Sequence, residues 1–114
     1  MWWKMKKANK DVNLSDLKTE MLHFINDLEE SLGYEITITS AYRSPEHPIE
    51  AKKDKPGEHT EGLAIDVAAV GGTAVYEIVK HALNLGCKRV GISRKSNFVH
   101  LGLSKHRVTS IWTY

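Results

Sequence analysis

The middle of the chain reads Gly57-Glu58-His59-Thr60-Glu61-Gly62-Leu63-Ala64-Ile65-Asp66-Val67. From residue 63 onward, large aliphatic side chains occupy every second position, which is the pattern of a β-strand that buries one of its faces. Asp66 falls on the other face, between two alanines. Aspartate is disfavoured within strands, and burying its carboxylate without a partner is costly. Asp66 therefore needs a metal ion, another cation or solvent.

A second strand pattern places a histidine on the equivalent face. In residues 97–103 the aliphatic side chains share one side of the strand, and His100 lies on the other. Taken singly, a histidine in a strand is more often a structural or surface residue. Together with Asp66 and His59, however, His100 offers a set of two imidazole nitrogens and one carboxylate oxygen, which leaves an open position on a tetrahedral Zn²⁺. We therefore predict that His59, Asp66 and His100 bind zinc in a hydrolase.

The flanking segments predict helices and further strands. Apolar residues recur at helical spacing over 14–32, with Ser15 as N-cap and Gly33 as the stop, and again over 73–85. Alternating patterns predict four strands, at residues 34–40, 63–68, 89–92 and 98–103.

The segment 41–62 is polar and rich in proline and lysine, which predicts a long loop with a short helix near residues 46–53. The order of elements predicts an α+β fold. We expect a small, mainly antiparallel sheet of about four strands, with two main helices packed on one face and a zinc site on the other.

Composition bounds the class of protein. The chain has 114 residues, of which 41% are hydrophobic and 26% charged, so we expect one domain that spans residues 1–114. The single cysteine, Cys87, excludes an intramolecular disulfide. The formal net charge is +2, and clustered lysines would allow contact with a polyanion, although a solvated face is the simpler explanation.

The distribution of apolar residues bears on location. No apolar run approaches the length of a membrane span, and no apolar segment of a signal peptide follows the basic start of the chain. We therefore expect synthesis in the cytoplasm without a signal peptide and no membrane insertion. We also expect a monomer that does not bind nucleic acid, since no recognition motif accompanies the basic residues.

Three segments resemble a family of zinc peptidases. They read Ile38-Thr39-Ser40-Ala41-Tyr42-Arg43-Ser44-Pro45-Glu46-His47, Glu58-His59-Thr60-Glu61-Gly62-Leu63-Ala64-Ile65-Asp66-Val67 and Phe98-Val99-His100-Leu101. In this order they resemble the zinc peptidases that include D-alanyl-D-alanine carboxypeptidases and phage L-alanyl-D-glutamate endopeptidases, over roughly residues 36 to 103.

The resemblance implies roles for individual residues. The two histidines and the aspartate match the family's three zinc ligands, namely His59, Asp66 and His100. Arg43 matches an arginine that binds the substrate carboxylate, and a guanidinium suits this role because it can hold a carboxylate through two hydrogen bonds. Without a substrate role, Arg43 would be a loop arginine that pairs with Glu46 or Glu50.

The chain departs from the family at the expected acid. Family members commonly place an acidic residue three positions before or two positions after the last histidine ligand, where this chain has Asn97 and Gly102. Neither residue can accept a proton from water at neutral pH. The general base is therefore unassigned. Glu46, Glu58 and Glu61 are the nearby acids, and we name Glu61 as the candidate because it neighbours the ligand loop. Taken alone, each of them is more often a solvated loop glutamate.

The implied function is hydrolysis of a peptide bond in the peptidoglycan stem peptide by metal-activated water, of the D-Ala-D-Ala carboxypeptidase or the L-Ala-D-Glu endopeptidase type. The small size and basic character suit a phage lysin that acts on the bacterial cell wall after release from the cytoplasm. The absence of an acid near His100 suggests an alternative, a catalytically silent, zinc-stabilised module that binds a wall peptide or a protein partner. A basic nucleic-acid binder is a third and less supported alternative.

Overall fold

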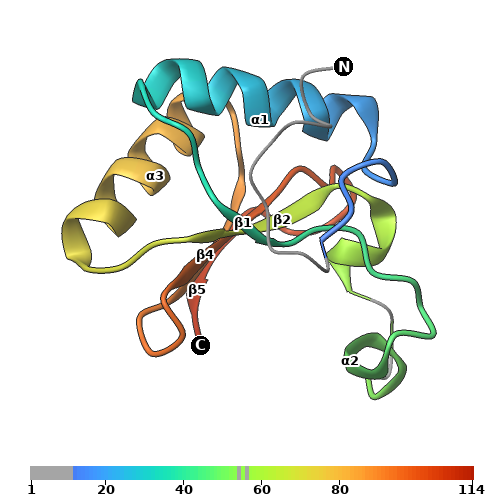
Figure 1. Cartoon of the computed structure of the whole chain (residues 1–114). Coiled ribbons are helices and arrows are strands. Elements are labelled where there is room, and N and C mark those ends of the chain that lie inside the picture. Colours follow the sequence, from blue (N-terminus) through green and yellow to red (C-terminus); the bar gives the residue numbers. More distant parts are fainter. Residues whose placement is uncertain (1–11, 54, 56) are drawn as a thin grey trace.

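The computed structural model describes residues 12–53, 55 and 57–114 (Figure 1). Its elements are α1 (Thr19–Leu32), β1 (Ile38–Ser40), α2 (Pro48–Ala51), η2 (Glu58–Glu61), β2 (Ala64–Ala68), α3 (Gly72–Asn84), β3 (Arg89–Ser93), β4 (Phe98–Gly102) and β5 (Ser110–Thr113). The strands form one sheet in the order β1-β2-β4-β3-β5. The α+β fold predicted from the sequence is confirmed.

The sheet is mixed, because one of its strand pairs is parallel. β1 with β2, β2 with β4, and β3 with β4 are antiparallel, whereas β5 runs parallel to β3. The four predicted strands are present. β5 was missed, although Ser110–Thr113 combines β-branched and aromatic residues, which favour strands. β1 is shorter than predicted, since the N–H of Ile36 donates to the Glu29 carboxylate (2.9 Å) and pairing with β2 begins at Ile38.

The hydrophobic core lies between the sheet and the two long helices. α1 and α3 lie on the same side of the sheet, as Figure 1 shows and as the sequence predicted. The buried side chains of these helices are Met21, Phe24, Ile25, Leu28, Val75, Ile78 and Ala82. They pack with the aliphatic side chains of the central strands, Ile65, Val67, Val99 and Leu101, all fully buried. None of the helices in the described part of the chain combines the length and apolar character needed to cross a membrane.

The start of α1 differs from the prediction, and its end agrees with it. Ser15 is not the N-cap: its N–H and hydroxyl lie 2.9 and 2.6 Å from Oδ1 of Asn13, in a turn that precedes the helix, and α1 begins at Thr19. Gly33 ends the helix as predicted, because it takes the left-handed conformation (φ 81°) that favours glycine.

Gly62 fixes the turn between η2 and β2. It has φ 71°, and a Cβ at this position would lie 3.0 Å from the carbonyl oxygen of Asp16. Its own carbonyl accepts from the N–H of Lys18 at 2.9 Å. Gly62 therefore forms a tight turn that places the start of α1 against the segment that carries His59.

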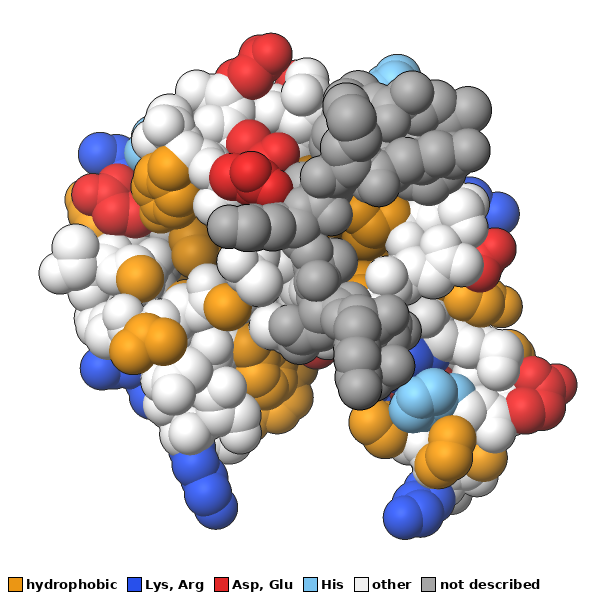
Figure 2. All heavy atoms as spheres, in the orientation of Figure 1, with side chains coloured by type: hydrophobic (Ala, Val, Ile, Leu, Met, Phe, Trp, Pro, Cys, Tyr) orange, Lys and Arg blue, Asp and Glu red, His pale blue; other side chains and the backbone are white. Residues whose placement is uncertain are grey.

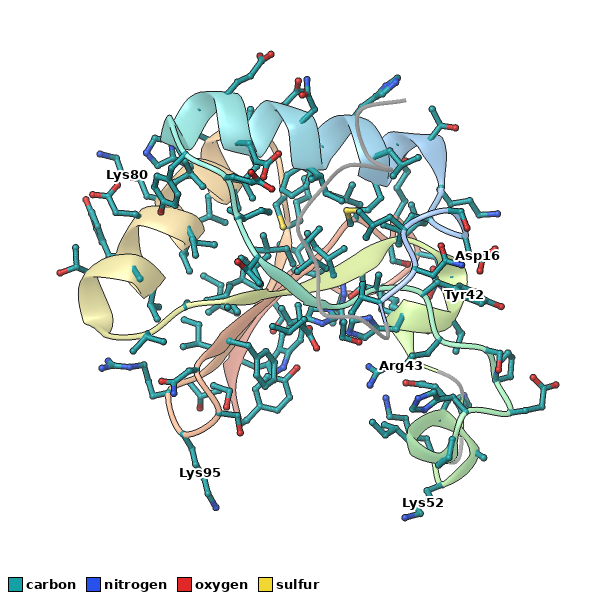
Figure 3. All side chains as sticks on the ribbon, in the orientation of Figure 1. Asp16, Tyr42, Arg43, Lys52, Lys80 and Lys95 are labelled. Carbon is teal, nitrogen blue, oxygen red and sulfur yellow. The ribbon has the colours of Figure 1, made fainter. Side chains whose placement is uncertain are left out.

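The loop between β1 and β2 projects from the side of the molecule away from α1 and α3 (Figure 1). This loop carries α2, which begins after His47, whose Nδ1 accepts from the N–H of Ile49 (3.2 Å). Figure 2 shows a wide hollow between this projection and the one that carries the β3–β4 turn. Lys52 and Lys95, labelled in Figure 3, lie at the ends of the two projections.

Candidate metal centre

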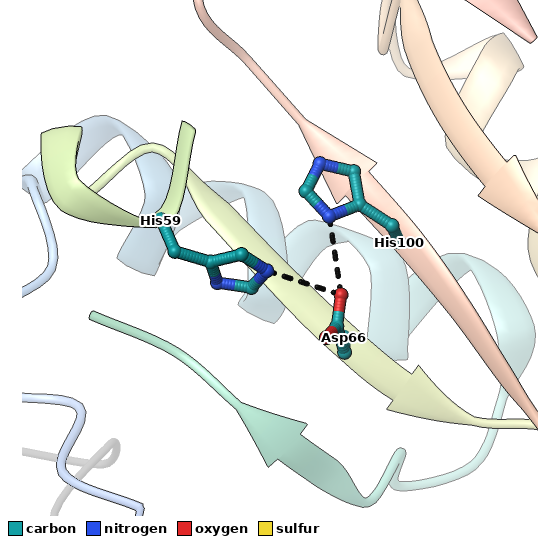
Figure 4. Close-up of side chains that lie close together, drawn as sticks. All are labelled: His59, Asp66 and His100. Carbon is teal, nitrogen blue, oxygen red and sulfur yellow. Dashed lines mark hydrogen bonds and ion pairs between the residues drawn. The ribbon is translucent and has the colours of Figure 1, made fainter. Parts of the chain in front are cut away.

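Three side chains predicted as zinc ligands meet on the sheet face opposite the helices (Figure 4). His59 comes from η2, Asp66 from β2 and His100 from β4. Asp66 and His100 are directly paired across β2 and β4, so their side chains point to the same face. Nε2 of His59 lies 3.2 Å from Oδ1 of Asp66, and Nδ1 of His100 lies 3.1 Å from the same oxygen.

The outer nitrogens of the two rings determine which inner nitrogens have lone pairs. Nδ1 of His59 lies 2.7 Å from the carbonyl oxygen of Ala41, which can only accept, so this nitrogen carries the proton. Nε2 of His100 lies 2.9 Å from Oε1 of Glu58, a shorter contact than the 3.1 Å between Nδ1 and Oδ1 of Asp66, which favours the proton on Nε2 in the neutral ring. In their neutral forms, both rings therefore direct a lone pair toward the Asp66 carboxylate.

Three electron-pair donors that converge in this way need a cation between them. Without a metal, protons fill that role. Burial alone would raise the pKa of Asp66, but hydrogen bonds from His100 and His59 outweigh it and lower the pKa to about 2. Burial would lower the pKa of His100, whereas its hydrogen bonds to Asp66 and Glu58 raise it.

The donor set fits zinc. Ligand atoms bound tetrahedrally at about 2.0–2.1 Å are separated from each other by about 3.3 Å. The distances from Oδ1 of Asp66 to the two histidine nitrogens, 3.2 and 3.1 Å, are close to this value, and the three candidate ligand atoms all lie within 4.8 Å of one another. Carbonyl and carboxylate partners on the outer nitrogens are also the usual way in which zinc-binding histidines are oriented.

Glu58 was only an alternative in the sequence analysis, yet its carboxylate lies in the centre of the site. The residue is 4% exposed, and its Oε1 accepts from Nε2 of His100 (2.9 Å) and from Nε of Arg89 (3.0 Å). Its Oε2 accepts from the N–H of Ser104 (3.0 Å). Burial would raise the pKa of Glu58, but these hydrogen bonds outweigh it and lower the pKa below the usual value.

The two positions that lack the expected acid have different surroundings. Asn97 lies in the β3–β4 turn with φ 57°, a conformation that asparagine tolerates better than most residues. Gly102 lies under Glu58: a Cβ at residue 102 would be 2.2 Å from both carboxylate oxygens. The space above Gly102 is therefore filled by a carboxylate from another part of the chain.

Arg43 points into the space between the sheet and α2 (Figure 3). Its Nε lies 3.1 Å from Oε2 of Glu50, an ion pair in which the angle is unsuitable for a hydrogen bond. Of the two partners considered from the sequence, Glu50 is therefore the one observed. Glu50 is 2% exposed and also accepts from the N–H of Gly57 (2.7 Å) and from Lys53 (3.1 Å). This buried carboxylate connects α2, the start of η2 and Arg43.

Glu61, the candidate base, contacts residues other than the three predicted ligands. Its Oε1 accepts from the hydroxyl of Ser104 (2.8 Å), and its Oε2 accepts from Nε of Arg107 at 2.5 Å. It does not line the cavity at the site described below. Its assignment as the base stays a prediction.

A cavity of about 390 Å³ opens above the three ligands. Ile49 and Lys53 line it on the α2 side, and Phe98, Trp112 and Tyr114 line it on the sheet side. Three arginines complete the wall, namely Arg43, Arg89 and Arg107. The cavity thus combines aromatic surface with cationic groups, which suits an anionic ligand with some apolar character.

Four residues of the site were not predicted for the roles they have: Glu50, Glu58, Arg89 and Trp112. The indole of Trp112 lies above Gly91, where a Cβ would meet it at 2.6 Å, and its ring centroid is 5.3 Å from that of His100. The rings of Trp112 and Tyr114 also lie close together, with centroids 6.4 Å apart. The signal for Trp112 was the strand-like run around it, whereas Glu50 and Glu58 resembled ordinary loop acids.

The fold and the cluster define the class of the protein, an α+β protein with a His-Asp-His candidate metal centre. The model of the family described as Peptidase M15 matches residues 1–102. The chain therefore belongs to the peptidase M15 family, which comprises zinc metallopeptidases of the D-Ala-D-Ala carboxypeptidase type that act on peptidoglycan. A comparison with curated proteins finds no match to the chain.

Proposed function

We propose that this protein is a zinc-dependent peptidase that hydrolyses a peptide bond in the stem peptide of peptidoglycan, of the D-Ala-D-Ala carboxypeptidase or L-Ala-D-Glu endopeptidase type. The observation that carries the proposal is the convergence of His59, Asp66 and His100 beneath a cavity that Arg43 also lines. Residues 1–114 would form a single catalytic domain that acts as a monomer.

His59 would contribute Nε2, Asp66 a carboxylate oxygen and His100 Nδ1 to the metal. Zinc bound there supplies a Lewis acid and lowers the pKa of a bound water. The protein holds the ligands before the metal arrives, because Ala41 orients one ring and Glu58 the other. Pre-orientation of this kind lowers the cost of ordering the site during binding.

Arg43 would bind the carboxylate of the substrate. A carboxylate that approaches end-on uses the two terminal nitrogens of a guanidinium, and Glu50 contacts the third nitrogen, Nε. Because Glu50 is buried, it would hold the guanidinium plane in one orientation above the site. The scissile bond would then lie at a fixed distance from the ligands.

Glu61 remains our prediction for the general base that moves a proton from water to the leaving amine. The role would require its side chain to leave Ser104 and Arg107 when substrate binds. We further propose that the protein acts on the cell wall after release from the cytoplasm, as a phage lysin does.

The test uses purified protein with one equivalent of zinc and two synthetic stem peptides, one with a D-Ala-D-Ala bond and one with an L-Ala-D-Glu bond. We expect cleavage of one peptide, loss of cleavage with a chelator, and recovery on addition of zinc. Clearing of permeabilised bacteria should follow the same pattern. Asp66→Ala should cleave neither peptide. Metal-independent cleavage, or no cleavage of either peptide by the zinc-loaded protein, would refute the proposal.

A silent zinc-stabilised binding module is the second candidate. It is favoured by the contacts that hold Glu61 outside the cavity and by the missing acids at residues 97 and 102. Such a module would bind the stem peptide in the presence of zinc and leave it intact. Asn97→Asp is a suitable rescue variant, since aspartate accepts the backbone conformation of this turn. Gly102→Asp is not suitable by itself, because its Cβ would collide with Glu58.

A further inference from the structure

The buried carboxylate of Glu58 has no role in the function proposed above beyond its contact with His100. It nevertheless accepts three hydrogen bonds, from His100, Arg89 and the N–H of Ser104. Both carboxylate oxygens accept from fixed donors, and the side chain is 3% exposed. A group held in this way is better suited to orient a neighbour than to collect a proton from water.

Gly102 is shaped to receive this carboxylate. A Cβ at residue 102 would lie 2.2 Å from Oε1 and from Oε2 of Glu58 and 2.3 Å from Cδ, separations that real atoms do not show. The φ of Gly102 is not in the left-handed region, so backbone conformation does not demand a glycine there. The absence of a side chain at residue 102 is therefore explained by the space that Glu58 needs.

We propose that Glu58 is a positioning residue that orients His100, and that glycine is required at residue 102 because it leaves the space that the Glu58 carboxylate occupies. This inference rests on the proposed zinc site. The hydrogen bond from Nε2 fixes the proton on the outer nitrogen, so the lone pair of Nδ1 points toward Asp66 and the metal. In this way the residue next to His59 in η2 places a carboxylate in the space that a side chain at residue 102 of β4 would otherwise fill.

A second layer of contacts holds Glu58 in place. The guanidinium of Arg89 donates to Glu58 and lies 5.0 Å from the ring centroid of Trp112. The indole of Trp112 in turn borders the ring of His100, and Gly91 leaves the room for it. The carboxylate and the indole thus restrict the same imidazole from two sides, which limits its rotation before metal binds.

The first experiment measures zinc affinity by competition with a chromogenic chelator. Glu58→Gln removes one acceptor oxygen and the negative charge while keeping the shape, and we expect zinc affinity to fall about 10- to 100-fold. Glu77→Gln is the matched control, since Glu77 lies 3.5 Å from His81 in a glutamate–histidine pair on α3 away from the site. The control should bind zinc as tightly as the natural protein. An affinity of Glu58→Gln within about threefold of the natural protein would overturn the proposal.

The second experiment moves the carboxylate. Gly102→Asp should weaken zinc binding because two carboxylates would then compete for one space. In Glu58→Ala with Gly102→Asp, the new aspartate occupies the vacated space, and we expect tighter zinc binding than in either single variant. If the double variant binds zinc no better than Gly102→Asp, the two residues are not complements and the proposal is wrong.

The third experiment determines the tautomer of the His100 ring by NMR. In ¹⁵N-labelled, zinc-free protein at a pH where the ring is neutral, the nitrogen shifts should show the proton on Nε2. Glu58→Gln should populate the other tautomer, whereas a purely structural role for Glu58 would leave the shifts unchanged. This readout also separates two failures: absence of zinc binding in the natural protein would refute the proposed function, and an unchanged tautomer in the variant would refute the positioning role.

Discussion

The two faces of the β2–β4 pair share one backbone register and differ in how their side chains are held. On the helix face, Ile65 lies opposite Leu101 and Val67 opposite Val99, and all four are fully buried. On the other face, Asp66 lies opposite His100. Packing of the aliphatic face depends on how well the side-chain volumes fill the core, whereas the positions of the polar side chains depend on individual hydrogen bonds with set directions. Substitutions on the two faces should therefore change different properties.

The largest effect is expected from Asp66→Ala. This change removes the oxygen toward which both rings point, so zinc affinity should fall by more than about a hundredfold and peptide cleavage should be lost. At neutral pH the zinc-free protein should also lose about 2 kcal/mol of its free energy of unfolding, which is the contribution that follows from the lowered pKa of Asp66. Metal content after dialysis and thermal unfolding measure the two properties. Full metal content in this variant would show that the three side chains are not the zinc ligands.

Leu101→Ala is the corresponding change on the aliphatic face. The side chain is fully buried in the core, so its loss should reduce the free energy of unfolding by about 3 kcal/mol. Denaturant unfolding measures the loss. At temperatures where the variant is folded, its zinc affinity should stay close to that of the natural protein. A large drop in zinc affinity would show that the two faces are not independent.

In zinc-free protein, the free energy of unfolding should depend on pH through the polar face and not through the aliphatic face. The pKa of Asp66 is lowered from 3.8 to about 2, so its contribution, about 2 kcal/mol, is present above pH 3.8 and is lost as the pH falls toward 2. The pKa of His100 is raised, so its contribution is complete below pH 6.5 and is lost as the pH rises through the folded-state value. Denaturant unfolding across this range should show both losses in Leu101→Ala, whereas Asp66→Asn should show a flatter profile. Identical profiles for the two variants would contradict this account.

The smallest effect is expected from Arg43→Lys. Lysine keeps the charge but cannot hold a carboxylate through two parallel hydrogen bonds, so kcat/KM for the stem peptide should fall about tenfold, mainly through KM. Zinc affinity should be unchanged, because the guanidinium pairs with Glu50, and the hydrogen bond from the backbone N–H of Arg43 to the carbonyl oxygen of His59 (3.2 Å) does not depend on the side chain. A peptide with an amidated carboxyl terminus is the control, since it should be cleaved equally by both proteins. Equal loss on the amidated peptide would argue against carboxylate recognition by Arg43.

The alternation along residues 63–68 and 98–102 was enough to place Asp66 and His100 on the face without aliphatic residues. This inference holds because strand side chains alternate strictly, and it needs no knowledge of distant contacts. Gly33 and Gly62 were likewise predictable, since both adopt a conformation that favours glycine. The start of α1 could not be predicted in this way, because Ser15 is a residue type that suits an N-cap but its side chain contacts Asn13 instead.

The sequence by itself determined the α+β class, the aliphatic core and three residues that could together hold one metal ion. Only the tertiary structure decided the partners of those ligands. Glu58 and Glu50 look alike in a polar loop, yet one orients His100 and the other holds Arg43. β5 and Trp112 also joined the site through a parallel pairing with β3. Periodicity reports only which side of its own strand or helix a residue faces. A contact between residues 58 and 100, or between 91 and 112, depends on how separate elements pack, and no local pattern encodes it.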